Sequence, residues 1–176
     1  MRHALFLGSL LAASCAPNPP PRWEVGGAPL LVRPARWESS DDDPIEITED
    51  GRVLDDGDLW LLIDRVGRVA DDDGEPLAVL FPDGHLAGED NRLLGRVGVT
   101  NGAPPGGAAA WFTIRKGGQV VRFDWDGEAS DSGRWVGCDG PQLRTCALVT
   151  QLAFLQRYHR PSGSGVRIGI GVGVGF

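Results

Sequence analysis

Two short acidic segments carry the residue types that hard cations prefer. Both read Asp-x-Asp-Gly-Glu, one at residues 71–75 and the other at 124–128. Ca²⁺ is bound by several carboxylate and carbonyl oxygens on a tight loop, although neither segment completes the twelve-residue EF-hand pattern. Asp-Gly is also a common hairpin turn, and acidic loops are often only solvated. Calcium binding and a plain turn both remain open, and the candidate ligands are Asp71, Asp73, Glu75, Asp124, Asp126 and Glu128.

No segment matches a known nucleophile, zinc or phosphate-binding motif. There is no G-x-S-x-G, no S-x-x-K and no P-loop, and His85 and His159 have no second ligand at zinc spacing. Carboxylate pairs that act on a glycan need a particular separation in space, which a sequence does not reveal. We therefore expect a protein that is not an enzyme and needs no cofactor, with a small envelope hydrolase as an alternative.

Four tryptophans lie in the central part of the chain, at positions 60, 111, 125 and 135. Such residues usually belong to a core, but they can also stack against sugar rings. Trp125 lies between two aspartates, so we expect it to be the most exposed of the four. A glycan-binding module is therefore a further alternative.

The N-terminus has the order of an export signal. The basic start Met1–His3 precedes an apolar stretch at residues 4–13 and a small-residue exit before Cys15. This stretch is too short to cross a bilayer as a helix, which needs roughly 20 residues.

Residues Leu11–Cys15 resemble a lipobox, the cleavage site of bacterial lipoprotein precursors. Ala12 departs from the pattern, because leucine is usual three positions before the cysteine. The resemblance implies removal of residues 1–14 and acylation of Cys15, for example by palmitate, so that the membrane is the first partner. Ala16, in place of an aspartate, implies sorting to the outer membrane.

The other two cysteines, Cys138 and Cys146, flank a strong turn at residues 139–141. In an oxidising compartment they are expected to form a disulfide, which leaves Cys15 as the odd thiol. The formal net charge of −7 argues against nucleic-acid binding and against electrostatic attachment to an anionic bilayer.

A rhythm of glycines predicts the fold class. Hydrophobic residues flank turn glycines at Gly51, Gly67, Gly84 and Gly118. Asn101–Gly102 keeps the turn chemistry without the whole pattern, and with it the glycines recur at intervals of 16 to 18 positions. This pattern is typical of antiparallel hairpins, so we expect a mainly β domain, as a sandwich, an open barrel or a meander. Residues 142–158 lack Gly and Pro and repeat leucines at helical spacing, which predicts one helix near the C-terminus.

These patterns divide the chain into four parts. Residues 1–14 are the signal peptide, 15–43 a Pro-rich tether, 44–160 a single β-rich domain, and 161–176 a Gly-rich tail. In the tail, the alternation over 166–176 resembles the terminal strand of outer-membrane barrels; an edge strand or an unstructured tail are the other interpretations. The body resembles uncharacterised envelope lipoproteins, so we expect a lipid-anchored, non-catalytic structural or binding component of the bacterial envelope that meets an envelope protein partner.

Overall fold

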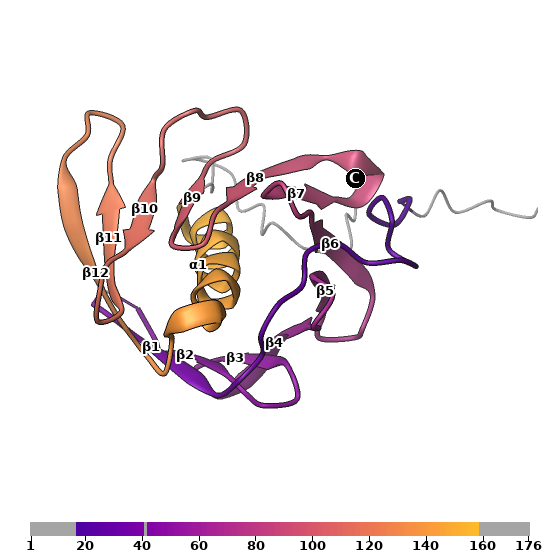
Figure 1. The fold of residues 1–176 in the computed structure, drawn as a ribbon, viewed down its shortest axis with the longest axis horizontal. Coiled ribbons are helices and arrows are strands. Elements are labelled where there is room, and N and C mark those ends of the chain that lie inside the picture. Colours follow the sequence, from indigo (N-terminus) through magenta and orange to yellow (C-terminus); the bar gives the residue numbers. More distant parts are fainter. Residues whose placement is uncertain (1–16, 41, 159–176) are drawn as a thin grey trace, which may run out of the picture.

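The computed structural model describes residues 17–40 and 42–158, which fold into a closed β-barrel (Figure 1). Twelve antiparallel strands follow one another around the barrel in sequence order, and β1 closes the ring by pairing with β12. The strands are β1 Ala35–Ser39, β2 Ile45–Ile47, β3 Arg52–Asp55, β4 Asp58–Ile63, β5 Arg68–Asp71, β6 Pro76–Leu80, β7 His85–Gly88, β8 Leu93–Val97, β9 Asn101–Ala103, β10 Phe112–Ile114, β11 Gln119–Phe123 and β12 Ala129–Val136.

In the described part of the chain, three helical segments complete the fold. They are the 3-10 turns η1 Glu89–Asn91 and η2 Gly140–Gln142, and the helix α1 Leu143–Tyr158. The prediction of a mainly β domain of antiparallel hairpins with one C-terminal helix is confirmed. We call the end of the barrel where β12 leads into α1 the entry end, and the opposite end the exit end.

Four of the five repeating glycines mark turns at the entry end, whereas the turn predicted at Gly102 is wrong, because this residue lies within β9. Gly51, Gly67, Gly84 and Gly118 have φ values between 77° and 92°, and each amide closes an i to i+3 turn. Each glycine carbonyl also accepts a hydrogen bond from the next hairpin, at 2.7–2.9 Å, from the amides of Ile63, Leu80, Val97 and Trp135. A Cβ on Gly51 or Gly118 would collide with the carbonyl of the strand it joins. Each of these glycines therefore serves both the turn within its own hairpin and the pairing with the next hairpin.

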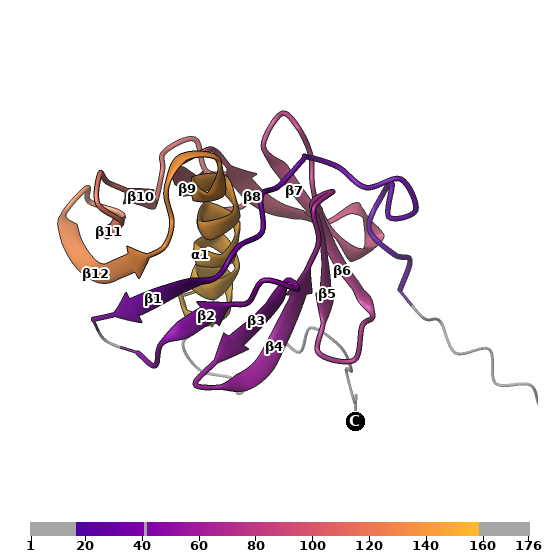
Figure 2. The same ribbon diagram turned by 60° about the horizontal axis from the view of Figure 1, so that its bottom comes forward.

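Helix α1 lies in the lumen of the barrel and is surrounded by strands in both views (Figures 1 and 2). Every residue from Thr145 to Phe154 is buried, so no face of this part of the helix meets solvent. A helix with apolar and small residues on all sides is stable only inside a core. Inward strand residues such as Trp37, Phe112 and Trp135 pack around it.

An aromatic cluster joins the helix to one side of the barrel wall. Phe154 contacts Phe112, Trp111 and Trp37, with ring centroids 5.2, 5.6 and 6.1 Å away. Trp37 stacks on Trp135 at 5.9 Å, which ties β1 to β12 where the ring closes. Aromatic pairs in these geometries contribute about 0.5–1.5 kcal/mol each beyond their buried area.

The predicted tether is wrong over residues 17–40. Residues 35–39 form β1, and Leu30 and Val32 belong to the core. Residues 26–34, which we call the entry segment, cross the entry end, where the Ala28 amide donates to the Leu80 carbonyl at 2.6 Å. The prolines and glycines that suggested a tether interrupt regular pairing but still allow alternate side chains to point into the barrel.

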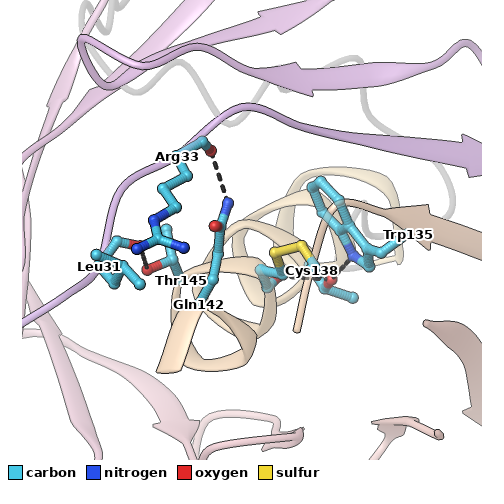
Figure 3. Close-up of a disulfide and its surroundings, with 8 residues drawn as sticks. Leu31, Arg33, Trp135, Cys138, Gln142 and Thr145 are labelled. Atoms are coloured by element: carbon cyan, nitrogen blue, oxygen red, sulfur yellow. Dashed lines mark hydrogen bonds between the residues drawn. A yellow bond between two sulfur atoms is a disulfide. The ribbon is translucent and has the colours of Figure 1, made fainter. Parts of the chain in front are cut away.

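The entry segment covers the start of α1 (Figure 3). The Thr145 hydroxyl donates to the Leu31 carbonyl at 2.7 Å, and the Gln142 side chain donates to the Arg33 carbonyl at 2.6 Å. Beside them, the predicted Cys138–Cys146 disulfide is present, with Cα atoms 6.4 Å apart. This small loop fixes the point where the chain turns from the wall into the lumen, and loop closure contributes about 2–3 kcal/mol in the chain-entropy model.

Within the described part of the chain, no helix combines the length and the apolar character needed to cross a membrane.

Gln151 is a polar residue of α1 that bonds the helix to the barrel wall. Its side-chain nitrogen donates to the carbonyls of Leu94 and Ala103, at 3.0 and 3.1 Å, and its oxygen accepts from the Trp111 indole at 2.8 Å. Leu94 lies in β8 and Ala103 in β9, so this one amide group bonds to two neighbouring strands of the wall.

We predict that Gln151→Leu, which keeps the side-chain volume, lowers the free energy of unfolding by about 3 kcal/mol or more. Three partly buried polar groups would lose their hydrogen bond to Gln151, and each such loss costs about 1–3 kcal/mol. Urea unfolding followed by circular dichroism measures the loss. Gln119→Leu is the matched control, because Gln119 bonds Asp131 at the surface and should change stability by less than about 0.5 kcal/mol. Equal losses in the two variants would contradict the role of Gln151.

Candidate functional site

An aromatic pocket opens at the exit end, between the β9–β10 loop and the β11–β12 turn. Its volume is about 380 Å³, within the range of small-molecule sites. Three structural elements contribute to it: the long loop, the end of β11 with its turn, and helix α1. The lining residues are Pro104, Ala109, Ala110, Trp111, Arg122, Phe123, Asp124, Trp125 and Phe154.

Trp111 is held firmly at the back of this aromatic pocket. Its amide donates to the Gly102 carbonyl at 2.9 Å, and its carbonyl accepts from the Phe123 amide at 2.8 Å. Its indole donates to Gln151, and its ring meets Phe154 edge to face. Backbone and side chain are therefore both positioned before any ligand arrives, which lowers the entropy lost on binding.

Trp125 stands at the mouth of the pocket and is 98% exposed. It follows Asp124 in a tight turn, closed by the Gly127 amide, which donates to the Asp124 carbonyl at 2.9 Å. Gly127 has a φ of 85°, the left-handed conformation that this turn requires. Because the turn is well formed, the exposure of Trp125 follows from its corner position. The prediction that Trp125 is the most exposed of the four tryptophans is confirmed.

A charged pair lies at the rim of the aromatic pocket. Arg122 Nε and Asp124 Oδ1 are 3.3 Å apart, and the two side chains are about one quarter and two fifths exposed. Asp124 is the single carboxylate among the described lining residues. Flat aromatic faces beside a few fixed polar groups suit a ligand with one apolar and one hydroxylated face.

A second hollow of about 250 Å³ lies on the other side of the same loop, where Ala108 and Ala110 approach β8 and β9. Beside it, the Arg96 guanidinium donates to His85 Nε2 at 2.9 Å. Nδ1 of this imidazole must then carry the proton, and it donates to Asp83 at 2.7 Å. The described lining residues of this hollow carry no hydroxyl, thiol or amine side chain.

The two acidic segments lie far from one another. Residues 71–75 form the β5–β6 turn and residues 124–128 the β11–β12 turn, half the circumference of the barrel apart. Asp71 accepts from the amides of Asp73 and Glu75, and Asp126 accepts from the Glu128 amide. Across residues 17–40 and 42–158, no three acidic, histidine or cysteine side chains form a cluster that could hold a metal ion. Of the six candidate ligands, Asp71 and Asp126 therefore stabilise their own turns through these hydrogen bonds, and Asp124 pairs with Arg122.

The remaining predicted residues have separate places. Trp135 is core and Trp60 packs against the core, so neither reaches the aromatic pocket. Cys15, the signal peptide and the tail at 161–176 lie outside the described residues. Sequence reasoning missed Arg122 and Phe154, since β11 and α1 are brought together only by the tertiary fold.

Comparisons of this chain with protein-family models, with curated proteins and with solved structures found no match.

We predict that His85→Ala raises the pKa of Asp83 toward its ordinary value. In the folded protein the hydrogen bond from the His85 side chain, together with that from the His85 amide, lowers the pKa of this carboxyl. A depressed pKa means that the pair stabilises the fold above the ordinary carboxyl range and that this contribution is lost as pH falls through the lowered pKa. A carboxyl ¹³C titration by NMR measures the shift, and an unchanged Asp83 curve in the variant would contradict it.

Proposed function

We propose that this chain is a lipid-anchored binding component of the bacterial cell envelope, attached through Cys15 and carried on the outer membrane. The lipobox-like sequence at residues 11–15 supports the anchor. A disulfide between Cys138 and Cys146 fits an oxidising compartment and leaves Cys15 as the odd cysteine. Acyl chains contribute about 0.8 kcal/mol per buried methylene, so two or three of them hold a protein firmly.

The observation that carries the binding role is a fully exposed Trp125 beside a preformed aromatic pocket. Its large apolar face is hydrated in the absence of a ligand and gains free energy when a ligand covers it. The proposed binding site lies outside the lumen of the barrel. Helix α1 fills the lumen, and the aromatic pocket lies between the turns at the exit end.

The proposed ligand is a saccharide. Sugar rings present C–H groups on their faces, which stack on indole, and hydroxyl groups at their edges, which pair with charged side chains. Trp125 and Trp111 offer the stacking surfaces, and Arg122 and Asp124 offer the hydrogen-bonding groups. A protein or peptide with exposed aromatic groups is the second candidate for the same pocket.

The anchor is tested by Cys15→Ser. We predict that this variant leaves the membrane fraction, is not processed at residue 15 and takes up no labelled palmitate in growing cells. The wild-type chain should label and sediment with outer membranes. If the variant fractionates and labels like the wild type, the lipid anchor is wrong.

The ligand is tested by Trp125→Ala. We predict that oligosaccharides of N-acetylglucosamine or glucose bind the wild-type domain in calorimetry and that the variant binds at least about tenfold more weakly, a change of about 1.4 kcal/mol. Stability should be unaffected, because the side chain is 98% exposed.

Val99→Ala is the matched control for this experiment. Val99 is also an exposed apolar residue, 57% accessible, but it lies in the β8–β9 turn at the entry end. Its removal should leave affinity unchanged. Absence of heat with every sugar, or equal affinities for the wild type and Trp125→Ala, would contradict the saccharide proposal.

A further inference from the structure

Asn18 is clamped to the turn between β7 and β8. Its amide and its side-chain nitrogen both donate to Asp90 Oδ1, at 3.1 and 2.9 Å. In return, the Asp90 amide donates to the Asn18 carbonyl at 3.0 Å. These bonds lower the pKa of Asp90, mainly through the Asn18 side chain. Three reciprocal hydrogen bonds thus hold residue 18 at η1.

The chain that follows Asn18 is also held in place by contacts. Pro20 is buried, and the Gly26 amide donates to the Arg22 carbonyl at 2.8 Å. Arg68 lies over the Trp23 ring with its Cζ 5.7 Å from the centroid, and Arg22 lies over Phe81 at 5.9 Å. Residues 18–25, which we call the docked segment, therefore belong to the barrel surface, and a movement of Asn18 would carry the barrel with it.

Only three residue steps separate Asn18 from Cys15. A chain spans at most about 3.3–3.6 Å per residue, so the clamp lies within about 10 Å of the cysteine. An acylated cysteine sits where its chains enter the hydrocarbon, at the level of the lipid headgroups. The turn carrying η1 must then be close to the bilayer surface.

We propose that the side of the barrel formed by η1 and the docked segment rests on the bilayer, with the aromatic pocket facing away from it. This inference rests on the proposed lipid anchor. In both ribbon views the docked segment lies on the opposite side of the molecule from β10, β11 and β12, whose turns carry the aromatic pocket (Figures 1 and 2).

The chemistry of this side fits an interface with lipid headgroups. Val25 is 70% exposed in the docked segment, and Leu93, two residues after η1, is 42% exposed. In the docked segment, Arg22 is also exposed and Trp23 is partly exposed. Tryptophan and arginine are favoured at the membrane–water interface, where a ring meets the acyl boundary and a cation meets phosphate.

Short-range quenching tests the orientation. The mature, lipidated protein is placed in phosphatidylcholine vesicles that contain headgroup spin-labelled lipid, and a fluorophore is attached at Arg92→Cys or at Asp126→Cys. Both positions are exposed; Arg92 follows η1, and Asp126 lies in the turn beside the aromatic pocket. We expect several-fold stronger quenching at position 92, whereas equal quenching, or stronger quenching at position 126, would overturn the proposal.

A longer tether is the matched control. About twelve Gly and Ser residues inserted between Ala16 and Pro17 add a coil of roughly 20 Å root-mean-square length. Vesicle attachment should remain, while quenching at position 92 falls toward that at position 126. Quenching that stays high in the insertion variant would show that the tether does not set the orientation. Loss of attachment in Cys15→Ser is scored separately, so failure of the anchor and failure of the orientation are distinguishable.

Discussion

A ring of twelve strands encloses more space than its own inward side chains fill, and the stability of this protein depends on what occupies that space. Barrel diameter grows with strand number, and a wide barrel is either hydrated or filled by another element. Here α1 fills it, buried on every side from Thr145 to Phe154. The helix and the wall are therefore mutually dependent, since each buries the apolar face of the other and neither has another core.

Because the helix fills the lumen, its buried polar side chains need hydrogen-bond partners inside the barrel. Thr150 donates to the Cys146 carbonyl and accepts from the Trp135 indole, and Gln151 reaches into the wall between β8 and β9. Gly95 and Gly102 make room for that amide, because a Cβ at either position would collide with it. The same amide holds Trp111, so the packing of the lumen also shapes the aromatic pocket outside it.

The two proposed roles, contact with the bilayer and binding of a saccharide, use opposite sides of one rigid barrel. Asn18 and the docked segment tie the N-terminal side to the barrel, and the aromatic pocket is built on strands across the molecule. A short tether on a rigid body restricts orientation, whereas a long tether would leave it free. In this scheme the closure of the barrel matters for function, because a rigid barrel fixes where the aromatic pocket lies relative to the lipid anchor.

Much of the local structure was predictable from the residues alone. Turn glycines need positive φ, so their spacing predicted the hairpins, and the stretch without Gly or Pro predicted α1 within one residue of its observed start. The Cys138–Cys146 pair and the exposure of Trp125 were equally local, because each depends on immediate neighbours.

What the sequence determined by itself was thus the hairpin character of the domain, helix α1, most of the turn chemistry and the disulfide. The tertiary structure decided that the hairpins close into a ring around the helix, that residues 26–39 belong to this barrel, and that the acidic turns stay apart. It also brought Phe154, Arg122 and Trp111 into one pocket. The physical reason is that ring closure and lumen filling are long-range: the pairing of β1 with β12 and the contacts of Gln151 join residues far apart in the chain, which no local pattern specifies.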